Sequence, residues 1–317
     1  MDKEINRLIH ASVDRSNQAA RILQNRRSPK TGRRIYTAKR GVTYCNKTFL
    51  QDQLTGRLAR TLIGQMETFA EGSEHIERRR IAFRDSIYRD FIVEETPTIS
   101  ASERVSSVIN VAGHYIGTDK LGHFFTEGKS YFDIAIAKGE GVERALLFGV
   151  FTESLYYGAL TTGVFSYADL TANFNGFQFW RRVVGKGSDN YIVCDGNKWI
   201  VNKPFEIALY VDEAWDESVN CSLFRNEILL TKVALRLKGR SCGASEDVYS
   251  NLSVKYQNLY SQLVNDRGHG ILPKSLEPDF MLVKYLHDDS TGEWLQETIK
   301  RSQGWFRQWE ENNTINR

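Results

Sequence analysis

The stretch HYIGTDKLGHFFTEG, residues 114–128, is the most unusual in the chain. On a helix, Asp119, His123 and Glu127 fall at positions i, i+4 and i+8 and line one face. Leucine and phenylalanine residues flank these three, so we expect the face to lie close to a hydrophobic core. An aspartate one helical turn from a histidine orients the imidazole and raises its basicity. The pattern therefore predicts a polar functional cluster inside a helical fold.

Two later segments carry similar polar residues. Glu153 is a lone acid in the apolar and aromatic stretch FTESLYYG, residues 151–158. In SYADLTANFNG, residues 166–176, Asp169 and Asn173 are one helical turn apart, and Ser166 is suited to cap the start of the helix. Glycines in these segments permit close helix packing, so we expect the three polar sets to meet.

Burying acids together with a histidine is costly unless they pair or bind a ligand. The first interpretation is a site for one divalent metal, zinc or manganese, whose bound water supplies the nucleophile. The candidate ligands are His123, Asp119, Asp169 and Glu153, with His114 as a possible extra ligand, and the expected supporting residues are Asn173, Glu127, Lys120 and Ser166.

Two other interpretations of the cluster stay open. One is metal-free catalysis, in which a desolvated Glu153 is the general acid and His123 or Asp169 is the base. The other is a structural hydrogen-bond network that fixes the helix register. The zinc-enzyme signatures HExxH and HxxEH are absent from the sequence, which counts against the metal interpretation.

Composition and charge narrow the class of protein. The chain has 317 residues, of which 41% are hydrophobic, and this is enough for a sizeable core. The net charge of only +3 argues against a dedicated nucleic-acid-binding protein. Glu153 interrupts the most apolar run, residues 145–165, so we expect a buried core helix rather than a transmembrane span. A basic stretch within residues 26–40 is either a patch for an anionic ligand or a solvated loop.

The four cysteines, Cys45, Cys194, Cys221 and Cys242, are widely spaced and form no CxxC pair. This favours two structural disulfides in an exported protein, periplasmic or otherwise, whose signal peptide is absent from this chain. The last three cysteines lie in one irregular region, so we expect a bridge among them. The alternative is a cytoplasmic protein with four free thiols.

Hydrophobic periodicity predicts a mostly α fold. We expect helices over residues 5–23, 49–69, 75–91, 108–137, 142–160, 167–184, 227–237, 245–264 and 291–310. Residues 191–194 and 198–201 flank an Asp-Gly turn and predict a small β-hairpin insert, which residues 205–215 extend to give a β element at about 190–215. The predicted regions are an N-terminal helical region (1–103), a central helical core with the polar cluster (104–185), and a C-terminal region packed on the same core (186–317).

The order DKxxHF (residues 119–124), then Glu153, then GxxSxxDLxxNxxG (residues 163–176) resembles a bacterial domain of unknown function. That domain occurs in small exported envelope proteins and predicted lipoproteins. The resemblance covers residues 114–176 and implies an envelope location in Gram-negative bacteria, but it brings no settled activity. It does not explain the acidic run DEAWDESVNC, residues 212–221, which is either a solvated helix face or a site for a hard cation such as calcium.

The sequence therefore predicts an exported bacterial envelope protein, with a metal-dependent hydrolase acting on an envelope component as its functional hypothesis. Lipid, peptidoglycan and protein all remain open as substrates. One alternative is a non-catalytic envelope binding or scaffold protein whose polar cluster is structural. The other is a secreted toxin or effector.

Overall fold

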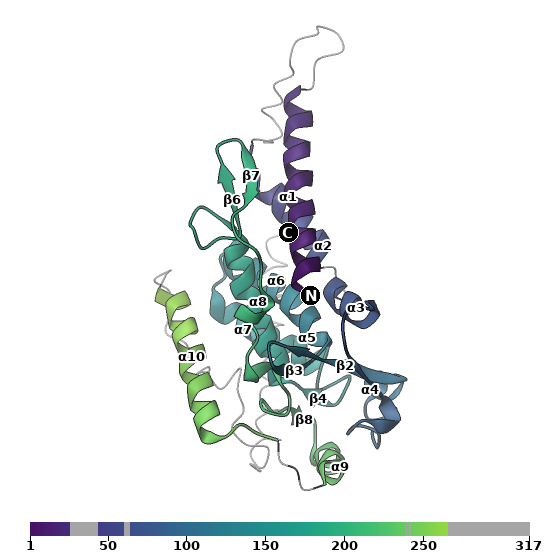
Figure 1. Ribbon diagram of the computed structural model, residues 1–317. Coiled ribbons are helices and arrows are strands. Elements are labelled where there is room, and N and C mark those ends of the chain that lie inside the picture. Colours follow the sequence, from purple (N-terminus) through teal and green to yellow (C-terminus); the bar gives the residue numbers. More distant parts are fainter. Residues whose placement is uncertain (26–43, 60–63, 239, 241, 266–317) are drawn as a thin grey trace, which may run out of the picture.

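The structure is a computed structural model that describes residues 1–25, 44–59, 64–238, 240 and 242–265 (Figure 1). The basic stretch within residues 26–40 and the helix expected over residues 291–310 lie outside the described residues. Most of the described chain is helical, which confirms the predicted fold class. The helices are α1 (Asp2–Asn25), α2 (Lys47–Leu58), α3 (Gln65–Gly72), α4 (Pro97–Ser100), α5 (Asp119–Gly122), α6 (Gly128–Phe132), α7 (Val142–Leu155), α8 (Tyr167–Val183), α9 (Glu227–Leu237) and α10 (Glu246–Asn265).

Three small sheets accompany the helices in the described part of the chain. Their strands are β1 (Arg79–Ala82), β2 (Arg104–Val111), β3 (His114–Gly117), β4 (Val164–Phe165), β5 (Val184–Gly185), β6 (Ile192–Asp195), β7 (Lys198–Val201) and β8 (Leu223–Phe224). The sheet orders are β1-β2-β3, β4-β8 and β5-β6-β7. The β6–β7 pair is the hairpin predicted from the Asp-Gly turn, with Gly196 at a φ of 61°.

The sequence prediction was wrong for two segments before the site. Residues 75–91 contain β1 and a short 3₁₀ helix (Phe83–Asp85) instead of a helix, and residues 108–117 form β2 and β3 instead of the start of one. Valine and isoleucine are frequent in β2, and its burial alternates as a half-buried strand requires. Ala112 and Gly113, both with positive φ, close the β2–β3 hairpin in a two-residue turn.

Two further boundaries differ from the prediction. The helix expected over residues 49–69 is divided into α2 and α3, and residues 60–63 between them lie outside the described part of the chain. The β extension expected over residues 205–215 is wrong, because this stretch forms two 3₁₀ helices, Ile207–Leu209 and Glu213–Trp215. Asp212 caps the second by accepting a hydrogen bond from the Ala214 backbone.

The element that carries the site is one uninterrupted helical stretch from Asp119 to Ala137. It passes through α5, a π-helical segment η3 (His123–Glu127), α6, and a second π-helical segment η4 (Asp133–Ala137), with αR backbone angles at every junction. In η3 the Gly128 amide bonds the His123 carbonyl, a bond from i+5 to i. Such π-helical turns are rare, and they are often found at functional sites.

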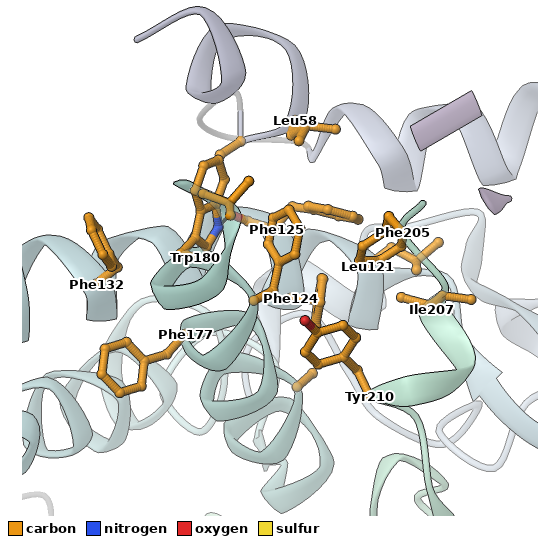
Figure 2. Packing of buried hydrophobic residues seen from close by; sticks show 14 of the residues in the cluster. Leu58, Leu121, Phe124, Phe125, Phe132, Phe177, Trp180, Phe205, Ile207 and Tyr210 are labelled. Atoms are coloured by element: carbon orange, nitrogen blue, oxygen red, sulfur yellow. Dashed lines mark hydrogen bonds between the residues drawn. The ribbon is translucent and has the colours of Figure 1, made fainter. Parts of the chain in front are cut away.

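Helix α8 packs against this stretch at close range. A Cβ at Gly128 would lie 2.6 Å from Gly176 Cα, and a Cβ at Gly176 would lie 1.8 Å from the carbonyl oxygen of Phe124. The Trp180 indole donates to the Phe125 carbonyl at 2.9 Å. Figure 2 shows Phe124 and Phe125 projecting into an aromatic core with Phe205 and Tyr210. The polar side of the helix is thereby turned toward α8 and α7.

Asparagine side chains connect α1 to residues 199 and 205, and two disulfides connect further segments of the chain. Asn6 and Asn17 of α1 each exchange two hydrogen bonds with backbone groups, those of Phe205 and Trp199 respectively. A disulfide joins Cys45 to Cys194, and another joins Cys221 to Cys242. The second is a bridge among the last three cysteines, as predicted. Among the described residues, no helix is both long enough and apolar enough to cross a membrane.

We predict that Gly176→Ala destabilises the protein severely, by about 1–3 kcal/mol or more, because the added methyl group collides with the backbone of Phe124. Urea unfolding measures the difference. The control is Gly56→Ala in α2, where nothing lies within 4 Å of the added Cβ. Alanine should stabilise that exposed helical position by up to about 1 kcal/mol. Equal effects of the two substitutions would show that α8 does not depend on this close contact.

Candidate functional site

The start of the helical stretch presents Asp119 and His123 on one face. Gly117, at the end of β3, leaves room for the Asp119 carboxylate, since a Cβ there would lie 2.2 Å from Asp119 Oδ1. His123 follows one helical turn later, where the π-helical segment begins. The predicted i, i+4 relation between the acid and the imidazole is therefore present.

Helix α8 supplies the opposite side of the cluster. The Ser166 hydroxyl caps α8 by accepting a hydrogen bond from the Asp169 amide at 3.2 Å. Asp169 Oδ2 lies 3.2 Å from His123 Nε2. One turn further along, the Asn173 amide lies 3.0 Å from His123 Nδ1. Both ring nitrogens of His123 thus face polar groups of α8.

Lys120 lies inside the cluster and is only 1% exposed. Its Nζ is 3.0 Å from Asp119 Oδ2, 2.6 Å from Asp169 Oδ1 and 2.6 Å from Glu217 Oε1. Burial alone would lower the pKa of Lys120, but the three carboxylates outweigh it and hold the pKa above its usual range. Lys120 is therefore a permanent cation at the centre of the site.

The charges of Asp169 and His123 stabilise each other. Burial alone would raise the pKa of Asp169, but His123 and Lys120 hold it well below its usual range. Burial alone would lower the pKa of His123, but the charge of Asp169 and the hydrogen bond to it raise the pKa to about 10. Asp169 is therefore an anion at neutral pH, and its carboxylate favours a positive charge on the imidazole.

The Asn173 amide is satisfied when its nitrogen, rather than its oxygen, faces the imidazole. In that orientation it donates to Nδ1 at 3.0 Å and to the backbone carbonyls of Asp169 and His123 at 3.2 and 3.3 Å. A neutral imidazole that accepts at Nδ1 carries its proton on Nε2, facing Asp169.

Glu153 lies behind this pair on α7 and is 2% exposed. Its Oε1 accepts a hydrogen bond from the Ser166 backbone amide at 3.0 Å. Burial and the negative charge of Asp169 raise the pKa of Glu153 well above its usual range. Glu153 is therefore a neutral acid next to the Asp169 anion. The pKa values of these two carboxyl groups are shifted apart, as they are in acid–base catalytic sites.

The other predicted residues lie at the edge of the cluster or outside it. Glu127 is buried, and burial raises its pKa, but the group of potential ligands formed by described residues does not include it. His114 pairs with Val111 at the start of β3 and is likewise outside that group. The sequence predicts that Glu127 and His114 lie on the same helix as His123. This is wrong for His114, because it belongs to β3, which precedes the helix.

Two acids of the site were missed from the sequence. Glu217 comes from the acidic run and bonds both Lys120 and the Ser166 hydroxyl, so the solvated-face interpretation is wrong for this residue. It is also wrong for Asp212, which is buried and accepts hydrogen bonds from Tyr256. Glu67 of α3 approaches the cluster from the other side, and burial and the charge of Asp119 raise its pKa to about 7.

The cluster reaches the surface. The side chains of Asp119, His123 and Asp169 keep exposed fractions of 30%, 14% and 10%. The ring of Tyr157, which is 47% exposed, meets the His123 imidazole edge-on at 6.4 Å between centroids. The imidazole and the carboxylates are therefore partly accessible to solvent.

The residues present fit a divalent metal. Asp119, His123 and Asp169 form the only group of three potential ligands found within the described residues, with ligand atoms all within 4.8 Å of one another. Asp119 Oδ1 is buried and has no hydrogen-bond partner among the described residues. Carboxylate and imidazole ligands suit both zinc and manganese.

Comparison of the chain with protein-family models, with curated proteins and with solved structures finds no match.

We predict that Lys120→Met destabilises the protein by about 3–5 kcal/mol at pH 7, because three carboxylates lose their buried counter-ion. Without the ammonium the negative charges repel one another in the folded protein, and protons that bind at lower pH relieve this repulsion. The loss should therefore be greatest at neutral pH and shrink as the pH falls toward 5. Urea unfolding at the two pH values measures it.

The control is Lys232→Met, which removes a surface ion pair with Glu95 and should cost less than about 1 kcal/mol at either pH. A Lys120→Met variant as stable as this control would show that the carboxylates do not need the ammonium.

Proposed function

We propose that this chain is an exported envelope protein that binds one divalent metal, zinc or manganese, and hydrolyses an envelope component. The observation that carries the proposal is the convergence of Asp119, His123 and Asp169 beside the unpartnered Asp119 Oδ1. Lys120 contacts one oxygen of each aspartate. The metal would be held by Asp119 Oδ1 together with Asp169 Oδ2 and His123 Nε2, which contact each other at 3.2 Å when no metal lies between them.

The bound metal would supply a water of lowered pKa as the nucleophile. The residues of the chain have separate tasks. Asn173 donates its amide N–H to Nδ1 and so fixes the His123 ring with Nε2 toward Asp169. Lys120 offsets the negative charge of the carboxylates. Glu153 holds a proton at neutral pH behind Asp169 and is the candidate proton donor.

The cysteines support an exported location. All four are paired in two disulfides, and disulfides form and persist in oxidising compartments. We place the protein in the periplasm, because the order of polar residues from Asp119 to Gly176 resembles that of exported Gram-negative envelope proteins.

The surface next to His123 favours a substrate with an apolar part. Tyr156, Tyr157 and Leu160, at the end of α7 and in the following turn, are 60%, 47% and 54% exposed. Tyr157 connects this apolar surface to the imidazole. An apolar surface therefore lies next to the charged cluster. Among lipid, peptidoglycan and protein, an amphiphilic lipid fits this combination best.

A non-catalytic scaffold is the second candidate, and Lys120 is the observation that favours it. Its ammonium already contacts three carboxylates, so the charges are partly compensated without a metal. In that case the role of the cluster is to fix the positions of α5, α8 and the segment that contains Glu217. The function of the protein would then be to bind a partner through its surface.

We predict that the chain, purified without chelator or a histidine tag, contains about one equivalent of zinc or manganese, because its ligands converge on a single centre. His123→Ala should lose this metal together with hydrolytic activity on lipid ester substrates. Elemental analysis of both proteins gives the metal content.

His10→Ala is the matched control, since His10 is exposed on α1, and it should retain the metal. Absence of metal from the native protein, with His123→Ala lowering only the melting temperature, would exclude the metal site and leave the scaffold as the function of the cluster.

A further inference from the structure

A polar hollow lies between α1 and α2, the two helices that pack against each other in Figure 1. Its volume is about 620 Å³, within the range of pockets that hold small ligands. α1 contributes residues 11, 14, 15, 17, 18 and 21, which follow the three- and four-residue spacing of one helix face. α2 contributes Arg57. The hollow shares no residue with the cluster around His123.

The side chains that line this hollow are mostly positive. Three of them are the guanidinium groups of Arg15, Arg21 and Arg57, and none of these forms an ion pair with a carboxylate of the described residues. Asp14 is the acid of the lining, so three positive charges lie near one negative charge. Neighbouring positive charges without paired carboxylates attract anions from solution.

Two of the lining side chains are held in place by their own hydrogen bonds. Arg57 Nη1 donates to the Gln53 carbonyl oxygen at 3.2 Å and to Gln53 Oε1 at 3.0 Å. On the α1 side, Asn17 exchanges two hydrogen bonds of 2.8 Å with the backbone of Trp199. Part of the hollow is therefore positioned before a ligand arrives, which lowers the entropic cost of binding.

The sequence adds further positive charge next to the hollow. α1 ends at Asn25, one turn after Arg21, and residues 26–40 contain seven lysines and arginines and no acid. These residues lie outside the described part of the chain, and the hollow is defined without them. Because they follow α1 directly, their charge strengthens the attraction of anions to this end of the helix.

We propose that this hollow binds a phosphate group through Arg15, Arg21 and Arg57. A planar guanidinium donates two hydrogen bonds to one phosphate at once, and such charge-assisted bonds are stronger than those between neutral groups. A free phosphate and the phosphate of a lipid headgroup have this chemistry in common. The site is independent of the proposed metal site, since the two are built from different residues.

Calorimetric titration of the full chain with inorganic phosphate tests the site. Arg57→Gln should weaken phosphate binding roughly tenfold or more, because a charge-assisted donor is lost. Asp14→Asn should strengthen binding, because it removes the repelling carboxylate, and a misfolded variant could not produce this gain. Arg7→Gln is the matched control and should leave the affinity unchanged, because Arg7 lies on α1 outside the hollow and pairs with Glu4 at 2.6 Å.

Vesicle sedimentation distinguishes the two sources of phosphate. If the ligand is a lipid headgroup, the protein sediments with vesicles that contain phosphatidylglycerol, and Arg57→Gln reduces this binding whereas Arg7→Gln does not. If the ligand is a free phosphate, only the calorimetric signal depends on Arg57. Either result supports the site. If the wild type binds neither probe, or if Arg7→Gln weakens binding as much as Arg57→Gln, the hollow is not a phosphate site.

Discussion

The burial of Lys120 is the constraint on which the rest of the site depends. Removing an ammonium from water costs several kcal/mol unless anions and hydrogen bonds replace the lost hydration. Its three partners come from α5, from α8 and from the segment that ends at the Cys221–Cys242 disulfide. Lys120 can contact all three carboxylates only when these distant segments are in place. The disulfide and the helix packing therefore both help to hold the carboxylates around the ammonium.

Close backbone contacts make this arrangement possible. Gly128 and Gly176 bring α8 against the helical stretch, and Gly64 and Gly122 bring α3 against its first turn. The π-helical segment His123–Glu127, between Gly122 and Gly128, changes the rotation of the helix after His123. Glu127 is therefore buried away from the aspartates, although its spacing in the sequence predicts that it lies on the same helix face as Asp119. The site is therefore a product of helix geometry as much as of the residues in it.

These features explain which parts could be predicted from the sequence. Helical periodicity located α1, α7, α8, α9 and α10, and an Asp-Gly turn located the β6–β7 hairpin, because both signals are local. The β2–β3 hairpin was missed, since an Ala-Gly turn is a weak signal and the following helix masked the strand pattern. Glu67 and Glu217 were missed because only tertiary contacts bring them to Lys120 and Asp119, and no spacing in the chain records such contacts.

The charges of the cluster also limit what it can be. Three carboxylates, those of Asp119, Asp169 and Glu217, contact Lys120, and burial together with the charge of Asp169 keeps Glu153 protonated beside them. The His123 imidazole lies against Asp169 on one side and accepts from the Asn173 amide on the other. Asp119 Oδ1 is left without a hydrogen-bond partner among the described residues. This unpartnered oxygen, at a place that solvent reaches, is the feature on which the proposed metal site rests.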